Sequence, residues 1–364
     1  MPEALKESLL NKETIGRFAA YLHRADERID PDLFMGRVFD ASWSGLELKE
    51  RLHHIALCLK EFLPAEYRAA LKILYKTAAQ FTEGAFFSLA ICEYVALFGM
   101  DDWEASLPAL GEFTCLCSAE FAVRPFIVKD QPRMMAQMLI WAQSPNPEQR
   151  RLASEGCRPR LPWGIGLPAL KADPALILPI LEILKTDPEE NVRRSVANNL
   201  NDIAKDHPEL VIEILRNWHD EEIPAFAEIA TRALRTLIKK GDPAALELTG
   251  YQFGGDFEIL DFNIEPKTIP SGGDVRFSFT LHSTSEVEQN LVVDYTLHLA
   301  RANGKQTPKV FKLTKAKLAP GASLPVSRKY SFQEVTTRRY YSGEHAIEIQ
   351  VNGVICARGE FTVE

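Results

Sequence analysis

Cysteine is scarce and scattered in this sequence, and long apolar runs are missing. Six cysteines occur in 364 residues, and the closest pair, Cys115 and Cys117, has the spacing of neither a zinc knuckle nor a redox pair. We therefore expect buried thiols in a reducing compartment instead of a disulfide framework. No run of about 18 uncharged apolar residues occurs, which excludes a helical membrane span. The acid-bearing N-terminus does not resemble a signal peptide, so we expect a cytoplasmic protein with no membrane contact.

Familiar catalytic and cofactor motifs are absent as well. The histidines show no metal-ligand spacing, and no Gly-rich phosphate loop or Ser/His/Asp set is present. We therefore expect neither a metal nor another cofactor. The hydrophobic content of 46% and charged content of 25% are ordinary for a folded globular protein. The length favours two domains or one long repeat array, because single cores stop growing below this size.

Residues 1–250 have the pattern of a helical repeat protein. Apolar residues recur at helical spacing, and prolines separate the runs. The segments Asn146-Pro147-Glu148 and Asp187-Pro188-Glu189 each open an Arg-bearing stretch and lie 41 residues apart. This interval matches the roughly 40–47-residue period of HEAT repeats. We predict a HEAT-like α-solenoid domain over residues 1–250, a curved stack with a concave binding face.

The pattern changes after Gly250. Residues 257–364 alternate apolar and polar side chains, which is typical of strands with one buried face. Asn352-Gly353 separates two such runs and is the strongest short signal for a β-hairpin. We predict an immunoglobulin-like β-sandwich of about seven short strands over residues 257–364, without the intersheet cysteine pair of antibody domains. The fold class is thus multidomain, α then β, and 254–256 is the expected linker.

The net charge of -8 conceals an uneven distribution. Residues 257–364 carry a net charge of +1, and residues 301–341 hold ten basic side chains and one acid. Residues 124–160 hold seven basic side chains and three acids. Solvated strand faces would explain the basic run in the sandwich. However, Arg338 and Arg339 stand directly before Tyr340, and basic groups beside aromatics suit phosphate contact and groove insertion.

Three segments combine acids and arginines, and the first two of them also contain aromatic residues. They are residues 118–126, 150–163 and 192–202. At these residues, and at 9–15 and 46–51, the sequence resembles the AlkC branch of the HEAT-repeat DNA alkylation-repair glycosylases of the AlkC/AlkD superfamily. AlkC members with an appended immunoglobulin-like domain would account for the rest of the chain.

The resemblance implies an enzyme of base excision repair. It would be a monofunctional DNA glycosylase that hydrolyses the N-glycosidic bond of cationic alkylated bases, notably 3-methyladenine, with 3-methylcytosine and 1-methyladenine as further candidates. The partner would be double-stranded DNA containing these bases, gripped by its backbone, with the damaged base left largely in the stack. No obligate protein partner is expected, and a solenoid that grips a groove works as a monomer.

The chemistry points to two carboxylates and an aromatic wall. Alkylation of a ring nitrogen makes the base cationic and weakens its bond to the sugar, so little acid assistance is needed. The developing sugar cation is the difficulty, and preorganised anions stabilise it best. Glu120, Glu155 and Trp163 fit these catalytic roles by the resemblance. As alternatives, Glu120–Arg124 and Arg151–Glu155 are spaced as surface helix pairs, and Trp163 could be a core residue.

The remaining candidates are side chains expected to contact DNA. In the helical part they are Phe121, Arg124, Arg151, Arg158, Arg160, Arg193, Arg194, Asn198 and Asn199, and in the sandwich Arg338, Arg339 and Tyr340. Several have plainer explanations. Arg158 and Arg160 could pair with acids, the two asparagines could bind carbonyls between repeats, and Phe121 could belong to the core.

Two functions of other classes stay open. The same scaffold could bind distorted DNA without catalysis, which predicts tight binding and no base release. The acidic solenoid could instead be a HEAT/immunoglobulin scaffold for protein partners, which predicts negligible affinity for DNA and no steep dependence on salt.

Overall fold

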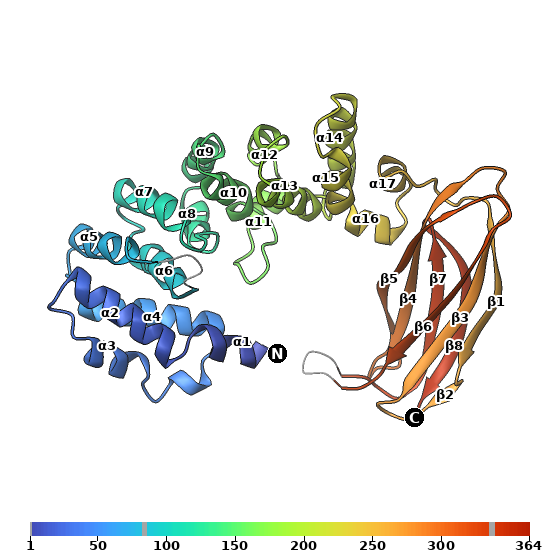
Figure 1. Cartoon of the computed structure of the whole chain (residues 1–364), viewed down its shortest axis with the longest axis horizontal. Helices are drawn as coiled ribbons and strands as arrows, with labels where there is room; N and C mark the ends of the chain where they lie inside the picture. Colours follow the sequence, from blue (N-terminus) through green and yellow to red (C-terminus); the bar gives the residue numbers. More distant parts are fainter. Residues whose placement is uncertain (1, 82–85, 335–338) are drawn as a thin grey trace. The chain divides into compact units, whose positions relative to one another are not determined.

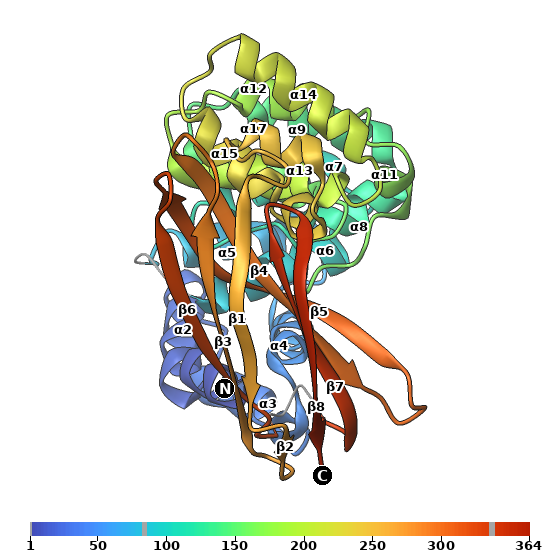
Figure 2. The same cartoon turned by 90° about the vertical axis from the view of Figure 1, so that its right-hand side faces the viewer.

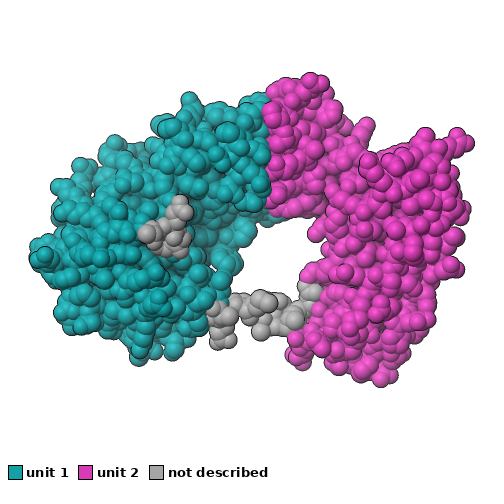
Figure 3. Space-filling view, viewed as in Figure 1, with its two compact units in different colours: residues 1–206 teal, residues 207–364 magenta. Residues whose placement is uncertain are grey.

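The computed structural model describes residues 2–81, 86–334 and 339–364. Contacts within the chain divide it into two compact units, residues 1–206 and residues 207–364 (Figure 3). The described part of the first unit is helical. The second unit consists of four helices followed by a β-sandwich, so these helices group with the strands in this division of the chain.

The first unit is built from short helices that pack against helices one to three positions away in the order of the chain. Helix α2 packs on α3 and α5, α4 on α6, and α10 on both α9 and α13 (Figure 1). The predicted helical repeat fold is confirmed. The helices are α1 (Pro2–Leu9), α2 (Lys12–Ala25), α3 (Pro31–Val38), α4 (Leu48–Phe62), α5 (Tyr67–Ala78), α6 (Leu89–Phe98), α7 (Trp103–Phe113), α8 (Val123–Lys129), α9 (Gln131–Ala142), α10 (Pro147–Gly156), α11 (Pro168–Ala172), α12 (Leu178–Leu184) and α13 (Glu190–Ile203), with 3-10 turns η1 (Trp43–Gly45) and η2 (Phe86–Ser88).

Helices α10 and α13 begin at the two segments that suggested the repeat. Asn146 caps α10, because its side chain accepts a hydrogen bond from the Glu148 amide at 2.9 Å with Pro147 at the first helical position. Helix α13 starts at Glu190, two residues beyond Pro188. Each helix buries several side chains, and the two helices pack against each other. Segments 41 residues apart in sequence therefore become neighbours.

The second unit begins with α14 (Pro208–Asp220), α15 (Phe226–Ala233), α16 (Arg235–Lys240) and α17 (Pro243–Leu248). Two sheets follow, one in the order β1-β3-β6 and the other in the order β2-β8-β7-β4-β5 (Figure 2). The predicted immunoglobulin-like sandwich is confirmed. Its strands are β1 (Phe257–Glu265), β2 (Thr268–Ile269), β3 (Asp274–Ser283), β4 (Gln289–Ala300), β5 (Gln306–Leu318), β6 (Ser323–Ser331), β7 (Gly343–Val351) and β8 (Val354–Val363). The additional strand is β2, which is too short to produce an alternation.

The hairpin between β7 and β8 forms as predicted. Asn352 and Gly353 have φ of 45° and 84°, the left-handed pair that a two-residue hairpin turn requires. The buried Asn352 side chain accepts from the Val292 amide at 2.8 Å and donates to the Gln252 carbonyl at 2.8 Å. The Gly254 amide donates to the Asn352 carbonyl at 3.0 Å. The expected linker is thus bound to the hairpin of the sandwich.

None of the helices that the structure describes is long and apolar enough to cross a membrane.

Candidate active site

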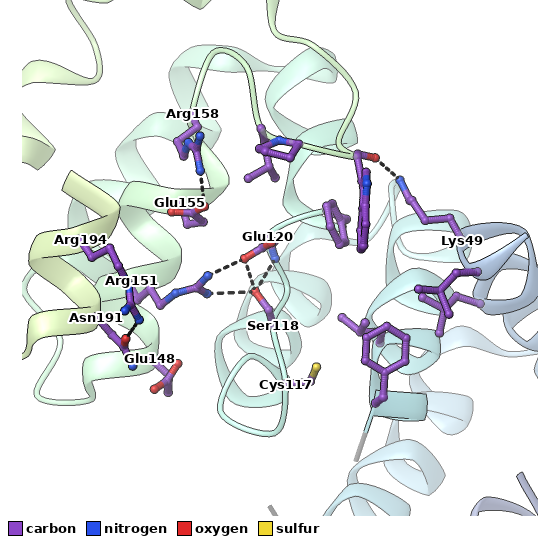
Figure 4. A pocket seen from close by; sticks show the side chains of 18 residues that line it. Lys49, Cys117, Ser118, Glu120, Glu148, Arg151, Glu155, Arg158, Asn191 and Arg194 are labelled. Atoms are coloured by element: carbon purple, nitrogen blue, oxygen red, sulfur yellow. Dashed lines mark hydrogen bonds and ion pairs between the residues drawn. The ribbon is translucent and has the colours of Figure 1, made fainter. Parts of the chain in front are cut away.

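A cavity of about 520 Å³ opens in the first unit (Figure 4). Its walls come from α4, η2, α6, α10, α13 and the loops that follow α7 and α10. The three residues predicted to be catalytic, Glu120, Glu155 and Trp163, all line it. They come from segments that are separated in sequence, so the fold brings the predicted constellation together.

Glu120 lies in the loop between α7 and α8, with one oxygen held and the other free. Its Oε2 accepts from Ser118 Oγ at 2.9 Å and from Arg151 Nη2 at 3.0 Å. Its side chain is 15% exposed, and the structure gives Oε1 no hydrogen-bond partner among the described residues. The surface pair between Glu120 and Arg124 does not form, because Glu120 precedes α8 and pairs with Arg151 of α10 instead. The charge of Glu120 is compensated, and one oxygen is still able to interact with a substrate.

Glu155 is buried on α10 and has partners on both oxygens. Arg158 Nη1 donates to Oε1 at 2.6 Å, and Ser195 Oγ of α13 donates to Oε2 at 2.6 Å. Arg158 Nε also donates to Asp202 at 2.9 Å. Desolvation opposes the charge of Arg158, but the carboxylates of Glu155 and Asp202 outweigh it and raise the pKa of Arg158. Glu155 is therefore a fixed carboxylate in the pocket wall.

Trp163 is an exposed aromatic on a strained backbone. Its φ of 63° lies in the left-handed region, and its side chain is 66% exposed. The tip of the loop is closed by the Gly164 amide, which donates to the Leu161 carbonyl at 3.1 Å. For a residue other than glycine this conformation costs on the order of 1 kcal/mol and occurs most often at functional sites. Trp163 is therefore not a core residue.

The pocket also holds a second aromatic ring and a thiol. Phe121 is half-buried, and Lys49 Nζ lies 4.7 Å from the centre of its ring. Burial raises the pKa of the Cys117 thiol, so a nucleophilic thiolate is disfavoured at neutral pH. The described residues contain no cluster of three or more His, Cys, Asp or Glu side chains arranged for a metal ion. Carboxylates and aromatic faces are suited to stabilising a cation, and the arginines hold the two carboxylates in place.

Comparisons with known proteins match both the helical part and the sandwich. The family described as "DNA alkylation repair enzyme" matches residues 64–234, and the family described as "Uncharacterised protein YhaZ, C-terminal Ig-like domain" matches residues 258–364. The Bacillus subtilis (strain 168) protein "Uncharacterized protein YhaZ" is 39% identical over 359 residues, which is 99% of each chain. The structure of Pseudomonas fluorescens alkylpurine DNA glycosylase AlkC, bound to DNA containing an abasic site analog, superimposes with a TM-score of 0.92 at 39% identity over 99% of each chain.

The chain belongs to the AlkC family of DNA alkylation-repair glycosylases. The match extends over both the helical part and the sandwich. The resemblance seen in five short segments is therefore confirmed for the whole chain.

Two of the arginines expected to contact DNA are buried in this AlkC-family protein. Arg124 is fully buried, and it donates to the backbone carbonyls of Ile165 at 2.6 Å and of Gly156 and Arg158 at 2.9 Å. Burial lowers the pKa of Arg124 to about 10. Arg158 is buried between Glu155 and Asp202, which is the acid pairing considered as an alternative. Neither guanidinium is available to a phosphate in this structure, because each is enclosed by its partners.

The other helical candidates lie closer to the surface. Arg151 and Arg194 line the cavity, and Arg194 contacts Asn191 beside it. Arg160 pairs with Asp206 at 2.6 Å and is 36% exposed. Arg193 donates to the carbonyls of Asp187 and Pro188 at 2.8 Å. Arg151, Arg160 and Arg194 keep guanidinium surface that DNA could reach.

The two asparagines on α13 differ in how far they are buried. Asn199 is buried, and its Nδ2 donates to the Ser154 carbonyl at 2.8 Å, which is the contact between repeats considered as an alternative. Asn198 is half-buried. In the sandwich, Arg339 is exposed, and its guanidinium lies 5.7 Å from the centre of the Tyr341 ring. Tyr340 is placed differently: its ring packs on the sandwich core, and its hydroxyl lies 2.9 Å from the Tyr330 hydroxyl. Arg338 lies outside the described residues.

Sequence reasoning missed Lys49, Ser118, Ser195 and Asp202. All four lie inside the segments that carried the resemblance, Lys49 in 46–51, Ser118 in 118–126, and Ser195 and Asp202 in 192–202, so their presence there was a usable signal. Lys49 stands 114 residues before Trp163, yet its Nζ donates to the Trp163 carbonyl at 2.6 Å. No local pattern marks that contact.

We predict that Arg158→Met destabilises the protein. Removing the cation leaves Glu155 buried without an ion-pair partner and Asp202 with Lys205 as its remaining one, at 3.0 Å, which costs about 3–5 kcal/mol. Chemical denaturation measures the effect. Arg160→Met is the matched control, because its exposed pair with Asp206 is worth at most about 1 kcal/mol. Equal stability losses in the two variants would show that the buried network is not a stabilising element.

Proposed function

We propose that this AlkC-family protein is a monofunctional DNA glycosylase that releases cationic alkylated bases in base excision repair. Its principal substrate would be 3-methyladenine, with 3-methylcytosine and 1-methyladenine as further substrates, and it would act as a monomer on double-stranded DNA in the cytoplasm. The convergence of Glu120, Glu155 and Trp163 in one pocket carries the proposal. The Pseudomonas fluorescens relative, an alkylpurine DNA glycosylase, supports the substrate class.

The reaction follows from the charge of the substrate. When the bond between C1′ and the base nitrogen breaks, its electron pair moves onto the base, which leaves as a neutral molecule without needing a proton. The sugar becomes an oxocarbenium-like cation. Water then adds to C1′ and loses a proton. The fixed carboxylate of Glu155 would supply a negative field, and the free oxygen of Glu120 would approach the sugar and accept the proton from water.

The exposure of Trp163 favours a mechanism in which the damaged base is not flipped out of the duplex. A flipped base is normally enclosed in a tight pocket and recognised on its Watson–Crick edge. Here Trp163 is 66% exposed, so the protein does not enclose the aromatic wall. Its face would pack against the cationic sugar or base. We propose that the damaged base stays largely in the stack while the carboxylates reach the deoxyribose.

We predict that Glu120→Gln lowers the single-turnover rate of 3-methyladenine release by about 10²–10³-fold, because the free oxygen loses its charge and basicity. Binding to DNA with an abasic-site analogue should change little. Glu155→Gln should also lower the rate, since the fixed field is weakened. Release is measured by chromatography of free base from methylated duplex DNA.

Glu104→Gln is the matched control, because this carboxylate is 82% exposed and its one ion pair among the described residues is with Arg133. It should retain the full rate. Full activity of both Glu120→Gln and Glu155→Gln would refute the carboxylate assignment. Tight DNA binding without any release by the wild-type protein would identify a non-catalytic binder instead, and negligible DNA affinity would favour a protein scaffold.

The basic segment of the sandwich would contact the DNA backbone. Arg338 and Arg339 are the proposed contacts, and Arg339 is exposed in the structure. A double variant that changes both to alanine should reduce the slope of log K against log salt by about 2, since each neutralised phosphate contributes about 0.9. This slope is measured by titrating the binding of duplex DNA at several salt concentrations. Arg358→Ala is the control, because Glu348 already compensates Arg358 at 2.8 Å. An unchanged slope in the double variant would exclude these contacts.

A further inference from the structure

Lys49 joins two loops of the pocket that are far apart in sequence. It is the second residue of α4, and its ammonium donates to the Trp163 carbonyl at 2.6 Å. The same Nζ lies 4.7 Å from the centre of the Phe121 ring. One cation therefore contacts both the loop after α7 and the loop after α10, and both loops supply an aromatic side chain to the cavity.

The loop that carries Trp163 is anchored at its base by Arg124. The guanidinium binds the carbonyls of Gly156 and Arg158 before the tip and the carbonyl of Ile165 after it. At the tip, residues 162–164, the Lys49 contact is the only hydrogen bond that a described side chain makes. Because Trp163 has φ of 63°, its backbone needs such a partner to keep a conformation that it would not otherwise favour.

The charge of Lys49 is unfavourable for the chemistry proposed. A pocket that stabilises a cationic sugar gains nothing from a nearby ammonium group, which repels it. The position of the Lys49 ammonium is better explained by its contacts with the Trp163 carbonyl and the Phe121 ring. Its charge is directed at a carbonyl oxygen and at the negative face of a ring, both of which attract a cation.

We propose that Lys49 is a positioning residue that sets the orientation of Trp163 and ties it to Phe121. This proposal rests on the proposed glycosylase function. Lys49 keeps the strained loop tip in place, so that the indole meets the sugar or base with its face. The competing role for an exposed lysine at this pocket is a direct contact with a DNA phosphate.

The first test compares Lys49→Met, Lys49→Arg and Lys60→Met in the full-length protein. Lys60 is a matched control on the same helix, because its Nζ donates to the Ala65 carbonyl at 3.1 Å and lies 5.4 Å from the Phe98 ring, away from the cavity. Lys49→Met should lower the single-turnover rate of 3-methyladenine release by about 10–100-fold, the cost of a misplaced group. The Kd for DNA should change less than about 3-fold, since no phosphate contact is lost. Lys49→Arg should restore most of the rate, and Lys60→Met should match the wild type.

The second test is a double-mutant cycle with Trp163→Ala. If Lys49 acts through Trp163, Lys49→Met has no further effect on the rate in the Trp163→Ala background. A loss of DNA affinity in both backgrounds, with a salt slope reduced by about 1, would mean that Lys49 binds a phosphate and would overturn the proposal. Additive losses of rate would overturn it as well.

A third readout does not depend on activity. Acrylamide quenching of Trp163 fluorescence, taken as the difference between each protein and its Trp163→Phe counterpart, should change in Lys49→Met and not in Lys60→Met. The same quenching in both variants would contradict the positioning role. If the wild-type protein released no base, the proposed function would fail, and this measurement would still decide whether Lys49 positions Trp163.

Discussion

The ion-pair network of Glu155, Arg158 and Asp202 is the interaction on which the geometry of the pocket depends. Arg158 is removed from water, so its charge is tolerable only while both carboxylates stay at hydrogen-bond distance. This requirement fixes α10 against α13, because Glu155 and Arg158 belong to α10 and the segment after it, whereas Asp202 lies on α13. The same helix α10 carries Arg151, which holds Glu120. The position of both candidate carboxylates is therefore set from α10.

The two carboxylates are held differently, and this difference suggests different tasks. Glu155 has a hydrogen-bond donor on each oxygen and is nearly inaccessible, so it contributes a field that needs no reorganisation during the reaction. Glu120 is partly exposed and its Oε1 has no hydrogen-bond partner in the part of the chain that the structure describes, so it is the group able to meet water and the sugar. Trp163 and Phe121 add aromatic faces, whose quadrupoles also favour a cation. Every part of the proposed chemistry thus serves a substrate that brings its own positive charge.

The fold class was predictable because its signals are local: a 3.6-residue period, a repeat of 41 residues, a strict alternation and an Asn352-Gly353 turn. The gathering of Glu120, Glu155 and Trp163 followed from resemblance, and no local pattern would have shown it. The burial of individual arginines was only partly predictable: pairing of Arg158 and Arg160 with acids was an open alternative, but which acids they meet depends on segments far along the chain. Arg158 meets Asp202 from 44 residues away, and Arg124 meets the carbonyl of Ile165 from 41 residues away. The role of Lys49 was not predicted because its partner, Trp163, lies 114 residues away in the sequence.

The most direct test of this account compares a cationic with a neutral lesion. Base release is measured from duplexes that differ only in one purine, 3-methyladenine or the neutral purine hypoxanthine, under single-turnover conditions. If the pocket stabilises the sugar cation and supplies no acid to the leaving base, 3-methyladenine is released and hypoxanthine is not. Release of hypoxanthine at a comparable rate would contradict the account, because a neutral base leaves only when the enzyme itself activates it.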